Sequence, residues 1–177
     1  MRILGVDPGT WRTGAGIIES QGSSYKLLHF EVIEVKQKTT PLADRLHKIY
    51  QSLTQIIQTH RPEILALENV FYGKDLQAMV KIGEARACAM LAASGHGISV
   101  VEYPPARVKQ SVSGNGRATK EQIQHMIKVL LNLKTPPPVD GSDALAVAIC
   151  HLHSCNQASA IQSSSYRGER KLKLVKG

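Results

Sequence analysis

Four carboxylates occupy positions from which they could hold a metal ion together. Asp7 ends a predicted first strand, and Glu68 ends a later, buried strand. Asp140 and Asp143 lie three residues apart in the first turn of a predicted helix, which places them on one face of that helix. Functional groups of open α/β sheets gather just beyond the carboxyl ends of the strands. If the helix packs across the sheet, all four side chains converge.

Such a convergence requires a cation, because two carboxylates 4 Å apart repel by roughly 4 kcal/mol at an effective dielectric near 20. Oxygen ligands without a neighbouring Cys or His favour Mg²⁺, for which Mn²⁺ can substitute. Two such ions can activate a water molecule, hold a phosphate and stabilise the leaving oxygen. The pattern therefore predicts phosphodiester hydrolysis, and the residues predicted to be both metal ligands and catalytic are Asp7, Glu68, Asp140 and Asp143.

Each carboxylate also has an ordinary structural explanation. Asp140 or Asp143 alone could cap a helix N-terminus, and Asp7 could be a turn residue beside its Pro-Gly pair. Glu68 is the hardest to explain in this way, because an unpaired carboxylate is costly in a strand buried on both faces. Glu68 therefore argues most strongly for a functional site.

Basic side chains flank a glycine-rich turn at residues 114–116. Lys120 lies in the first turn of a predicted helix, where the dipole disfavours a cation, so a nearby phosphate explains it better than helix stability does. Lys109 and Arg117 join it as candidate DNA-binding residues, since such a turn can bring its backbone close to phosphates. The alternative for each of them is an ordinary solvated charge.

Two aromatic side chains, Phe71 and Tyr72, follow Glu68 in the loop beside the predicted metal site, and Phe71 is the candidate for stacking on DNA bases. Stacking on a splayed base contributes about 1–3 kcal/mol and would hold opened DNA near the site. A loop aromatic can equally fill the core. Trp11 is not included among the stacking residues, because a tryptophan in a turn can cover a hydrophobic edge.

The elements that would position these residues follow from hydrophobic periodicity and turn signals. Alternating patterns predict three strands in an antiparallel meander, and later buried runs predict parallel strands separated by amphipathic helices. We therefore expect a mixed α/β sheet flanked by helices, with a loop over residues 104–118. The expected strands cover residues 2–7, 13–19, 25–35, 64–68 and 98–103. The expected helices cover residues 41–59, 75–94, 119 to the prolines at 136–138, and from about 140 through the apolar residues 144–150.

Length and charge are consistent with one nucleic-acid-binding domain. The chain has 177 residues and a net charge of +8, with 11 basic and 5 acidic residues after residue 100. The same surplus could simply serve solubility. We expect a nuclease domain over residues 1–155 and a basic, disordered tail over residues 156–177 that either extends DNA binding or keeps the protein soluble.

The cysteines and the N-terminus indicate the cytoplasm. Three cysteines without a CxxC pair are typical of reduced thiols rather than of a disulfide framework or a zinc site. No apolar segment of signal-peptide length follows Met1, and the longest apolar run, residues 144–150, is too short to cross a bilayer. We therefore expect a cytoplasmic protein without a membrane partner.

Five short segments, taken together, resemble the RuvC family of bacterial Holliday-junction resolvases, the crossover junction endodeoxyribonucleases. Each segment is a weak signal alone, but their order and spacing match over about residues 1–155. The segments are VDPGT at 6–10, ALENVF at 66–71, VKQ at 108–110, GRATK at 116–120 and DGSDALA at 140–146.

The resemblance implies a ribonuclease H-like fold and a homodimer that nicks four-way DNA junctions symmetrically with Mg²⁺, two ions per site, in homologous recombination and DNA repair. It implies that Asp7, Glu68, Asp140 and Asp143 form the metal site. It also implies roles for Lys109 and Lys120 in substrate binding and catalysis, stacking of Phe71 on unpaired bases, and partnership with the RuvA–RuvB branch-migration helicase complex.

A homodimer also follows from size. A compact domain of this length has a radius of gyration of about 16 Å and can house one such site, whereas a two-fold junction needs two symmetrical cuts. The small residues of the predicted helix over 75–94 could pack against a partner or against the helix's own sheet. Two other classes of protein remain open: an actin-like or sugar-kinase-type ATPase domain, suggested by the segment at 6–10, and a noncatalytic junction-binding protein.

Overall fold

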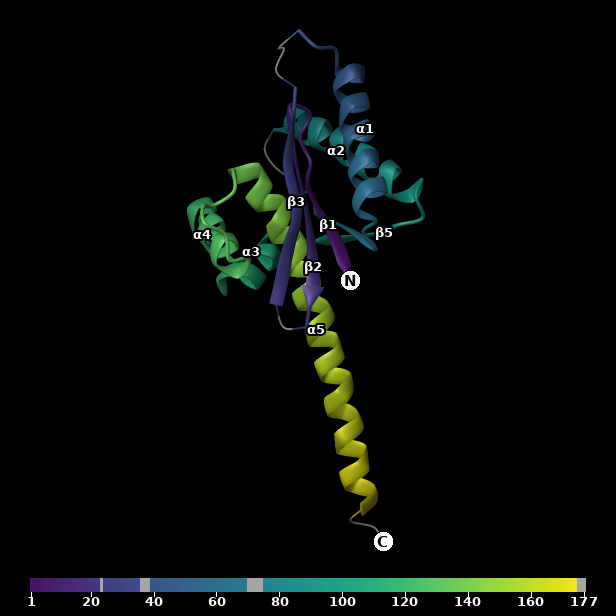
Figure 1. Ribbon diagram of the computed structural model, residues 1–177, viewed down its shortest axis with the longest axis vertical. Helices are drawn as coiled ribbons and strands as arrows, with labels where there is room; N and C mark the ends of the chain where they lie inside the picture. The colour runs from purple at the N-terminus through teal and green to yellow at the C-terminus, as the bar shows by residue number, and fades with distance from the viewer. Residues whose placement is uncertain (23, 36–38, 70–74, 175–177) are drawn as a thin grey trace.

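The computed structural model describes residues 1–22, 24–35, 39–69 and 75–174, and beyond residue 156 only the helical backbone. Its strands form one sheet in the order β3-β2-β1-β4-β5 (Figure 1). The first three strands pair antiparallel, and β4 and β5 continue the sheet parallel to β1. The predicted meander extended by parallel strands is confirmed. The strands are β1 (Arg2–Asp7), β2 (Arg12–Gln21), β3 (Ser24–Glu34), β4 (Ile64–Glu68) and β5 (Ser99–Tyr103).

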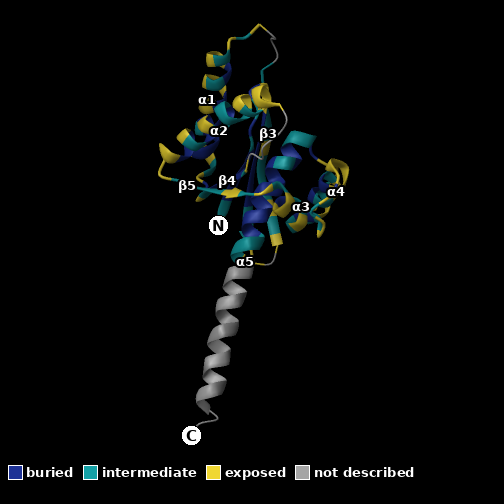
Figure 2. Ribbon diagram, turned by 180° about the vertical axis from the view of Figure 1, so that it is seen from behind, coloured by how far each residue is buried: buried dark blue, intermediate teal, exposed yellow. Residues whose placement is uncertain are grey.

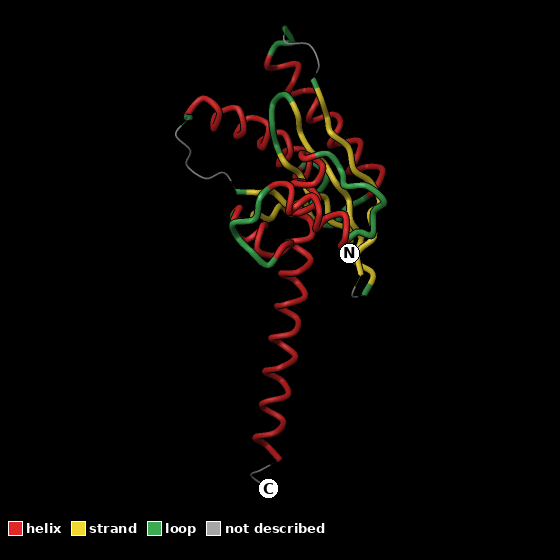
Figure 3. The backbone as a smooth tube through the Cα atoms, turned by 90° about the vertical axis from the view of Figure 1, so that its left-hand side faces the viewer, coloured by secondary structure: helices red, strands yellow, loops and turns green. Residues whose placement is uncertain are grey.

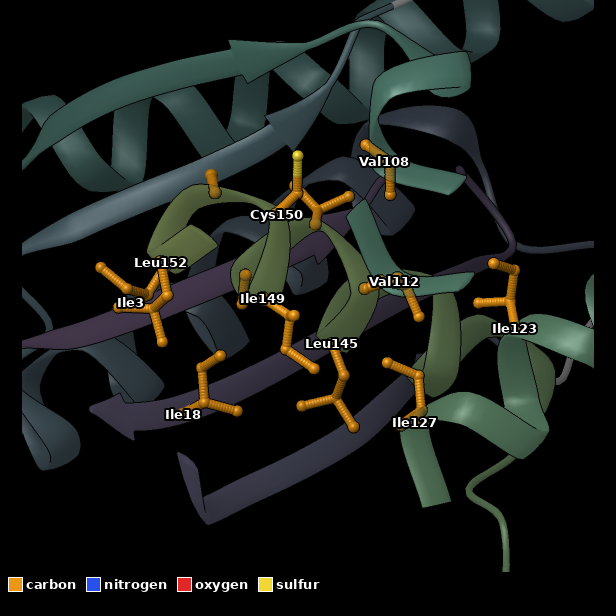
Figure 4. Packing of buried hydrophobic residues seen from close by; sticks show 14 of the residues in the cluster. Ile3, Ile18, Val108, Val112, Ile123, Ile127, Leu145, Ile149, Cys150 and Leu152 are labelled. Carbon is orange, nitrogen blue, oxygen red and sulfur yellow. The ribbon is translucent and has the colours of Figure 1, made fainter. Parts of the chain in front are cut away.

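Helices cover both faces of the sheet, so the strands lie in the middle of three layers (Figure 3). Two helices pack on one face, around a core that includes Leu53 and Leu67. Three pack on the other, around a core that includes Ile127 and Leu145 (Figure 4). The first pair is α1 (Leu42–His60) and α2 (Leu76–Ser94), and the second group is α3 (Pro105–Ser113), α4 (Lys120–Leu130) and α5 (Val139–Leu174).

Local sequence signals account for several helix boundaries. The capping box predicted at the start of α4 is present, since the Thr119 hydroxyl accepts a hydrogen bond from the Gln122 N–H and the Gln122 side chain accepts one from the Thr119 N–H. At α2 the Asp75 carboxylate accepts a hydrogen bond from the Ala78 N–H. Four of the small residues of α2, Ala85, Ala89, Ala92 and Ala93, are fully buried against its own face of the sheet.

The predicted loop over residues 104–118 is wrong in its first half, where α3 forms instead. Pro104 ends the preceding strand segment and Pro105 occupies the first helical position, where a missing N–H costs nothing. Val108 and Val112, four residues apart, are buried on one face of α3. The polar and basic residues between them conceal this short apolar stripe, and packing against α5 and α4 stabilises so short a helix.

The chain beyond residue 155 also differs from the expected disordered tail, because α5 continues as one helix to Leu174. Residues 156–174 contain no proline and one glycine, so nothing in the sequence breaks the helix there. The first part of α5 is buried on the sheet (Figure 2). The division into a domain of 155 residues and a separate tail stays a prediction. Among the described residues, no helix has both the length and the apolar character needed to cross a membrane.

Glycines let α5 lie directly on the sheet. An ideal Cβ at Gly14 would be 2.0 Å from the carbonyl oxygen of Asp140, and one at Gly5 would be 2.0 Å from that of Ala144. No side chain fits at such distances. The absence of two Cβ atoms therefore sets how closely the first turns of α5 approach β1 and β2.

We predict that Gly14→Ala lowers the free energy of unfolding by about 1–3 kcal/mol or more, because α5 must move away from β2. Gly83→Ala is the matched control: a Cβ there meets no atom within 4 Å, and alanine favours the helix by about 0.5–1 kcal/mol. Thermal and urea unfolding of both variants measures the difference. Equal stability of the two variants would show that α5 does not depend on this close approach.

Candidate active site

Two neighbouring parallel strands have their carboxyl ends side by side and bring the first two carboxylates together. β1 and β4 are parallel and pair Val6 with Leu67, so Asp7 and Glu68 follow in adjacent positions. Residues 64–67 of β4 are central in the sheet, and Leu65 and Leu67 are fully buried. Burial of the apolar residues of β4 thus places the Glu68 carboxylate at the carboxyl end of the strand.

The first turn of α5 adds the remaining carboxylates, since the close approach at Gly14 places Asp140 over β2. Asp7, Glu68 and Asp143 line one cavity of about 270 Å³ together with Lys109 of α3 and Lys120 of α4. Apolar side chains complete its wall: Pro105, Val108, Ile123 and Ala146. The structure thus gathers three carboxylates and two lysines from five elements.

Asp140 lies outside this lining and is held by a neighbour that no sequence pattern indicated. The Arg12 Nε donates a hydrogen bond to Asp140 Oδ2 at 2.7 Å, and Arg12 Nη1 lies 3.2 Å from Glu34 Oε1. No local pattern could reveal this pair, because 128 residues separate Arg12 from Asp140. Arg12 therefore acts as the counterion of one of the four carboxylates.

Lys120 is the counterion of a second carboxylate, Asp143. Its Nζ lies 3.1 Å from Asp143 Oδ2. Partial burial opposes the charge of Lys120, but Asp143, Asp7 and Asp140 outweigh this effect and raise the pKa of the ammonium group. The position of Lys120 in the first turn of a helix predicted an anion nearby. In this structure the anion that contacts it is a carboxylate of the site itself.

Burial and mutual repulsion act on the two strand-end carboxylates. Loss of hydration, followed by the charges of Asp143 and Glu68, raises the pKa of Asp7 from 3.8 to about 7. Burial and Asp143 likewise raise the pKa of Glu68, while Lys109 and Lys120 lower it. The two lysines therefore offset only part of the unfavourable interaction among the carboxylates.

The donor set fits a hard divalent cation, since it consists of carboxylate oxygens in a partly buried, negatively charged cavity. Among the described residues, however, no three Asp, Glu, His or Cys side chains are grouped closely enough to hold an ion as they stand. Asp140 and Asp143 turn instead toward Arg12 and Lys120. Rotation of these two side chains away from their protein counterions would free their oxygens for a metal.

The backbone at the end of β4 is held by a further arginine that no sequence pattern indicated. Arg86 of α2 donates a hydrogen bond from Nη1 to the Glu68 carbonyl oxygen at 2.8 Å and forms an ion pair with Glu102. The Asn69 N–H donates to the Tyr103 carbonyl oxygen at 2.8 Å. These contacts hold the Glu68 backbone in place where the strand ends.

The candidate DNA-binding residues lie in different places. Lys109 and Lys120 line the cavity. Arg117 is exposed in the turn before α4, where its N–H donates a hydrogen bond to Asn115 Oδ1, and it does not line the cavity. Phe71 lies outside the described residues.

Comparisons with known proteins agree on one family. The model of the family described as "Crossover junction endodeoxyribonuclease RuvC" matches residues 3–151. The chain is 46% identical over 163 residues to a protein of that name from Geobacter sp. strain M21, covering 92% of this chain and 98% of the relative. It is 45% identical to the one from Pelotomaculum thermopropionicum, covering 98% of this chain and 99% of that protein.

A solved structure has the same fold. The structure of Thermus thermophilus RuvC in complex with a Holliday junction substrate superposes with a TM-score of 0.84 at 32% identity, covering 89% of this chain and 96% of the other. The predicted sheet architecture and its assignment to the ribonuclease H-like class are therefore confirmed.

We predict that Asp7→Asn stabilises the protein in metal-free buffer, because it removes a buried and repelled charge. For an acid whose pKa is raised on folding, the penalty is absent below about pH 4, grows up to about pH 7 and is complete above it. Unfolding at pH 8 should therefore require about 2–4 kcal/mol more in the variant than in the original protein, with little difference at pH 4.

Asp44→Asn is the control for this measurement, since Asp44 is an exposed acid on α1. Urea unfolding of the three proteins between pH 4 and pH 8 measures the effect. If Asp7→Asn and the original protein lose stability in parallel as the pH rises, Asp7 does not carry the penalty.

Proposed function

Because the chain belongs to the RuvC family of crossover junction endodeoxyribonucleases, we propose that it resolves four-way DNA junctions by hydrolysing phosphodiester bonds in paired, symmetric strands. The observation that carries the proposal is the cavity in which Asp7, Glu68 and Asp143 meet Lys109 and Lys120. Carboxylates alone would repel a phosphate, and lysines alone would only bind one. The combination fits a site that binds an anionic strand and also holds the cations needed to cut it.

The residues of the chain divide this work. Asp7, Glu68, Asp140 and Asp143 would hold divalent metal, for which we propose two Mg²⁺ ions, with Mn²⁺ as a substitute. Metal bound there would supply an activated water and stabilise charge on the leaving oxygen. Lys109 and Lys120 attract the phosphate into the cavity, and the apolar wall limits the water that competes with the strand.

Lys120 has two roles in this scheme. Without metal it neutralises Asp143 through the 3.1 Å contact. With the carboxylates engaged by metal, its ammonium becomes available to a phosphate oxygen. The same side chain therefore stabilises the empty site and contributes to substrate binding in the loaded one.

Two symmetric nicks require two such sites, and the described chain forms one such cavity from β1, β4, α3, α4 and α5. We therefore propose a homodimer in which each subunit cuts one strand. Exposed Arg117 would contact the DNA backbone outside the cavity, and Phe71 would stack on an unpaired base. Family membership is the basis for proposing action in recombination and repair beside the RuvA–RuvB complex.

We predict that the purified protein with Mg²⁺ nicks a synthetic four-way junction at symmetric positions and leaves linear duplex of the same sequence largely intact. Chelator should abolish nicking but leave junction binding, and Asp7→Asn should do the same. Gel analysis of end-labelled junctions measures cutting, and fluorescence anisotropy measures binding. Binding without any cutting by the metal-loaded protein would make it a noncatalytic junction-binding protein.

We predict that Lys120→Ala slows junction cleavage by at least tenfold, the equivalent of about 1.4 kcal/mol, because the variant lacks a cation beside the phosphate. Lys128→Ala on the same helix is the matched control. It removes the same charge about 12 Å further along α4, and Lys128 does not line the cavity. Single-turnover rates over a salt titration compare the two. If both variants cut equally fast, Lys120 serves only as the counterion of Asp143 and contributes nothing to cleavage.

A further inference from the structure

The single tryptophan of the chain lies in the turn between β1 and β2, four residues after Asp7. Trp11 is 37% exposed, although its size would favour burial. The guanidinium carbon of Arg45, from the first turn of α1, lies 4.0 Å from the centroid of its ring. One face of the indole is thus covered by a cation, while the residue as a whole keeps more than a third of its surface exposed.

Arg45 is unusual because it is buried without an anionic partner. Arg45 is 9% exposed. Its Nη1 donates a hydrogen bond to Thr10 Oγ1 at 3.3 Å, and its Nε has no hydrogen-bond partner. Among the described residues, no carboxylate forms an ion pair with it. Burying a cation in this way is costly, and the contact with the indole face supplies the main compensation.

Trp11 and Arg45 do not line the cavity, but the residues on either side of Trp11 connect the pair to one of the four carboxylates. Arg12 directly follows Trp11 and donates a hydrogen bond to Asp140, while Thr10 directly precedes it and accepts the hydrogen bond from Arg45. The Trp11 carbonyl oxygen also accepts a hydrogen bond from the Val35 N–H at 3.0 Å. The indole is therefore fixed through its own backbone and through both neighbouring residues.

We propose that Trp11, held in place by Arg45, is a stacking platform for an unpaired nucleobase of the strand that enters the cavity. A flat aromatic face suits a base of any sequence. The cation beneath the indole adds positive charge beside the base, which favours an anionic strand there. If Trp11 only covered a hydrophobic edge, as the sequence suggested, the burial of an arginine without an ion pair against it would have no explanation. This inference rests on the proposed function.

Because Trp11 is the only tryptophan, the intrinsic tryptophan fluorescence of the protein reports on this side chain alone. The test titrates the protein, in chelator, with a synthetic four-way junction, and follows binding independently by anisotropy of a labelled junction. Stacking predicts a loss of tryptophan emission of more than half at saturation, and protection of the remaining emission from acrylamide. A linear duplex, which offers no unpaired base, should cause a much smaller change.

Variants separate stacking from a purely structural role. Trp11→Ala should weaken junction binding about tenfold or more, whereas Trp11→Phe, which keeps an aromatic face, should weaken it less than threefold. Tyr50→Ala is the matched control, because Tyr50 is 38% exposed on α1 and should leave binding unchanged. Thermal unfolding of each variant shows whether it folds, and Trp11→Phe keeps the test usable if the alanine variant does not.

Two results would overturn the inference. The first is saturating junction binding with unchanged emission and unchanged acrylamide access. The second is equal junction affinity of a folded Trp11→Ala and Tyr50→Ala. If labelled junction does not bind the original protein at all, the proposed function fails and this inference fails with it. Binding without an effect at Trp11 rejects the stacking platform alone.

Discussion

The close approach of α5 to the sheet is the constraint on which the site depends. At Gly5 and Gly14 the helix backbone occupies the space that a Cβ would need. This contact carries Asp140 and Asp143 over the ends of the strands, and it also forms the centre of the core in which Leu145 and Ile149 are buried. Packing and the placement of the carboxylates are therefore consequences of the same two missing side chains.

The electrostatics of the site oppose the stability of the fold. Burial and repulsion raise the pKa of Asp7 to about 7, so the folded protein holds a charge that it would be more stable without. Arg12 and Lys120 reduce this cost by pairing with Asp140 and Asp143. These contacts indicate how the proposed metal site can fold before it binds cations, since the protein provides two monovalent counterions of its own.

Much of this molecule was predictable from local pattern. The alternation of residues 2–7 and 13–19, the capping residues of α4 and the carboxylates at the ends of two strands lie within short windows of sequence, where periodicity is a direct physical signal. The helix α3 was not predictable in this way. Its apolar face consists of Val108 and Val112 and gains its stability from α5, which follows about 30 residues later. The continuation of α5 past residue 155 was missed for a different reason, since polar composition indicated disorder while the lack of proline permitted a helix.

The sequence by itself determined which groups are available for chemistry and at which end of the sheet they emerge. The type of a side chain and its position in a strand are local properties. Only the tertiary structure decided which charges face one another. Arg12 with Asp140, Arg86 with the end of β4, and Arg45 beneath Trp11 join elements that are far apart along the chain. Such pairs depend on how helices and strands pack, and no periodic pattern encodes the distance between two side chains brought together by folding.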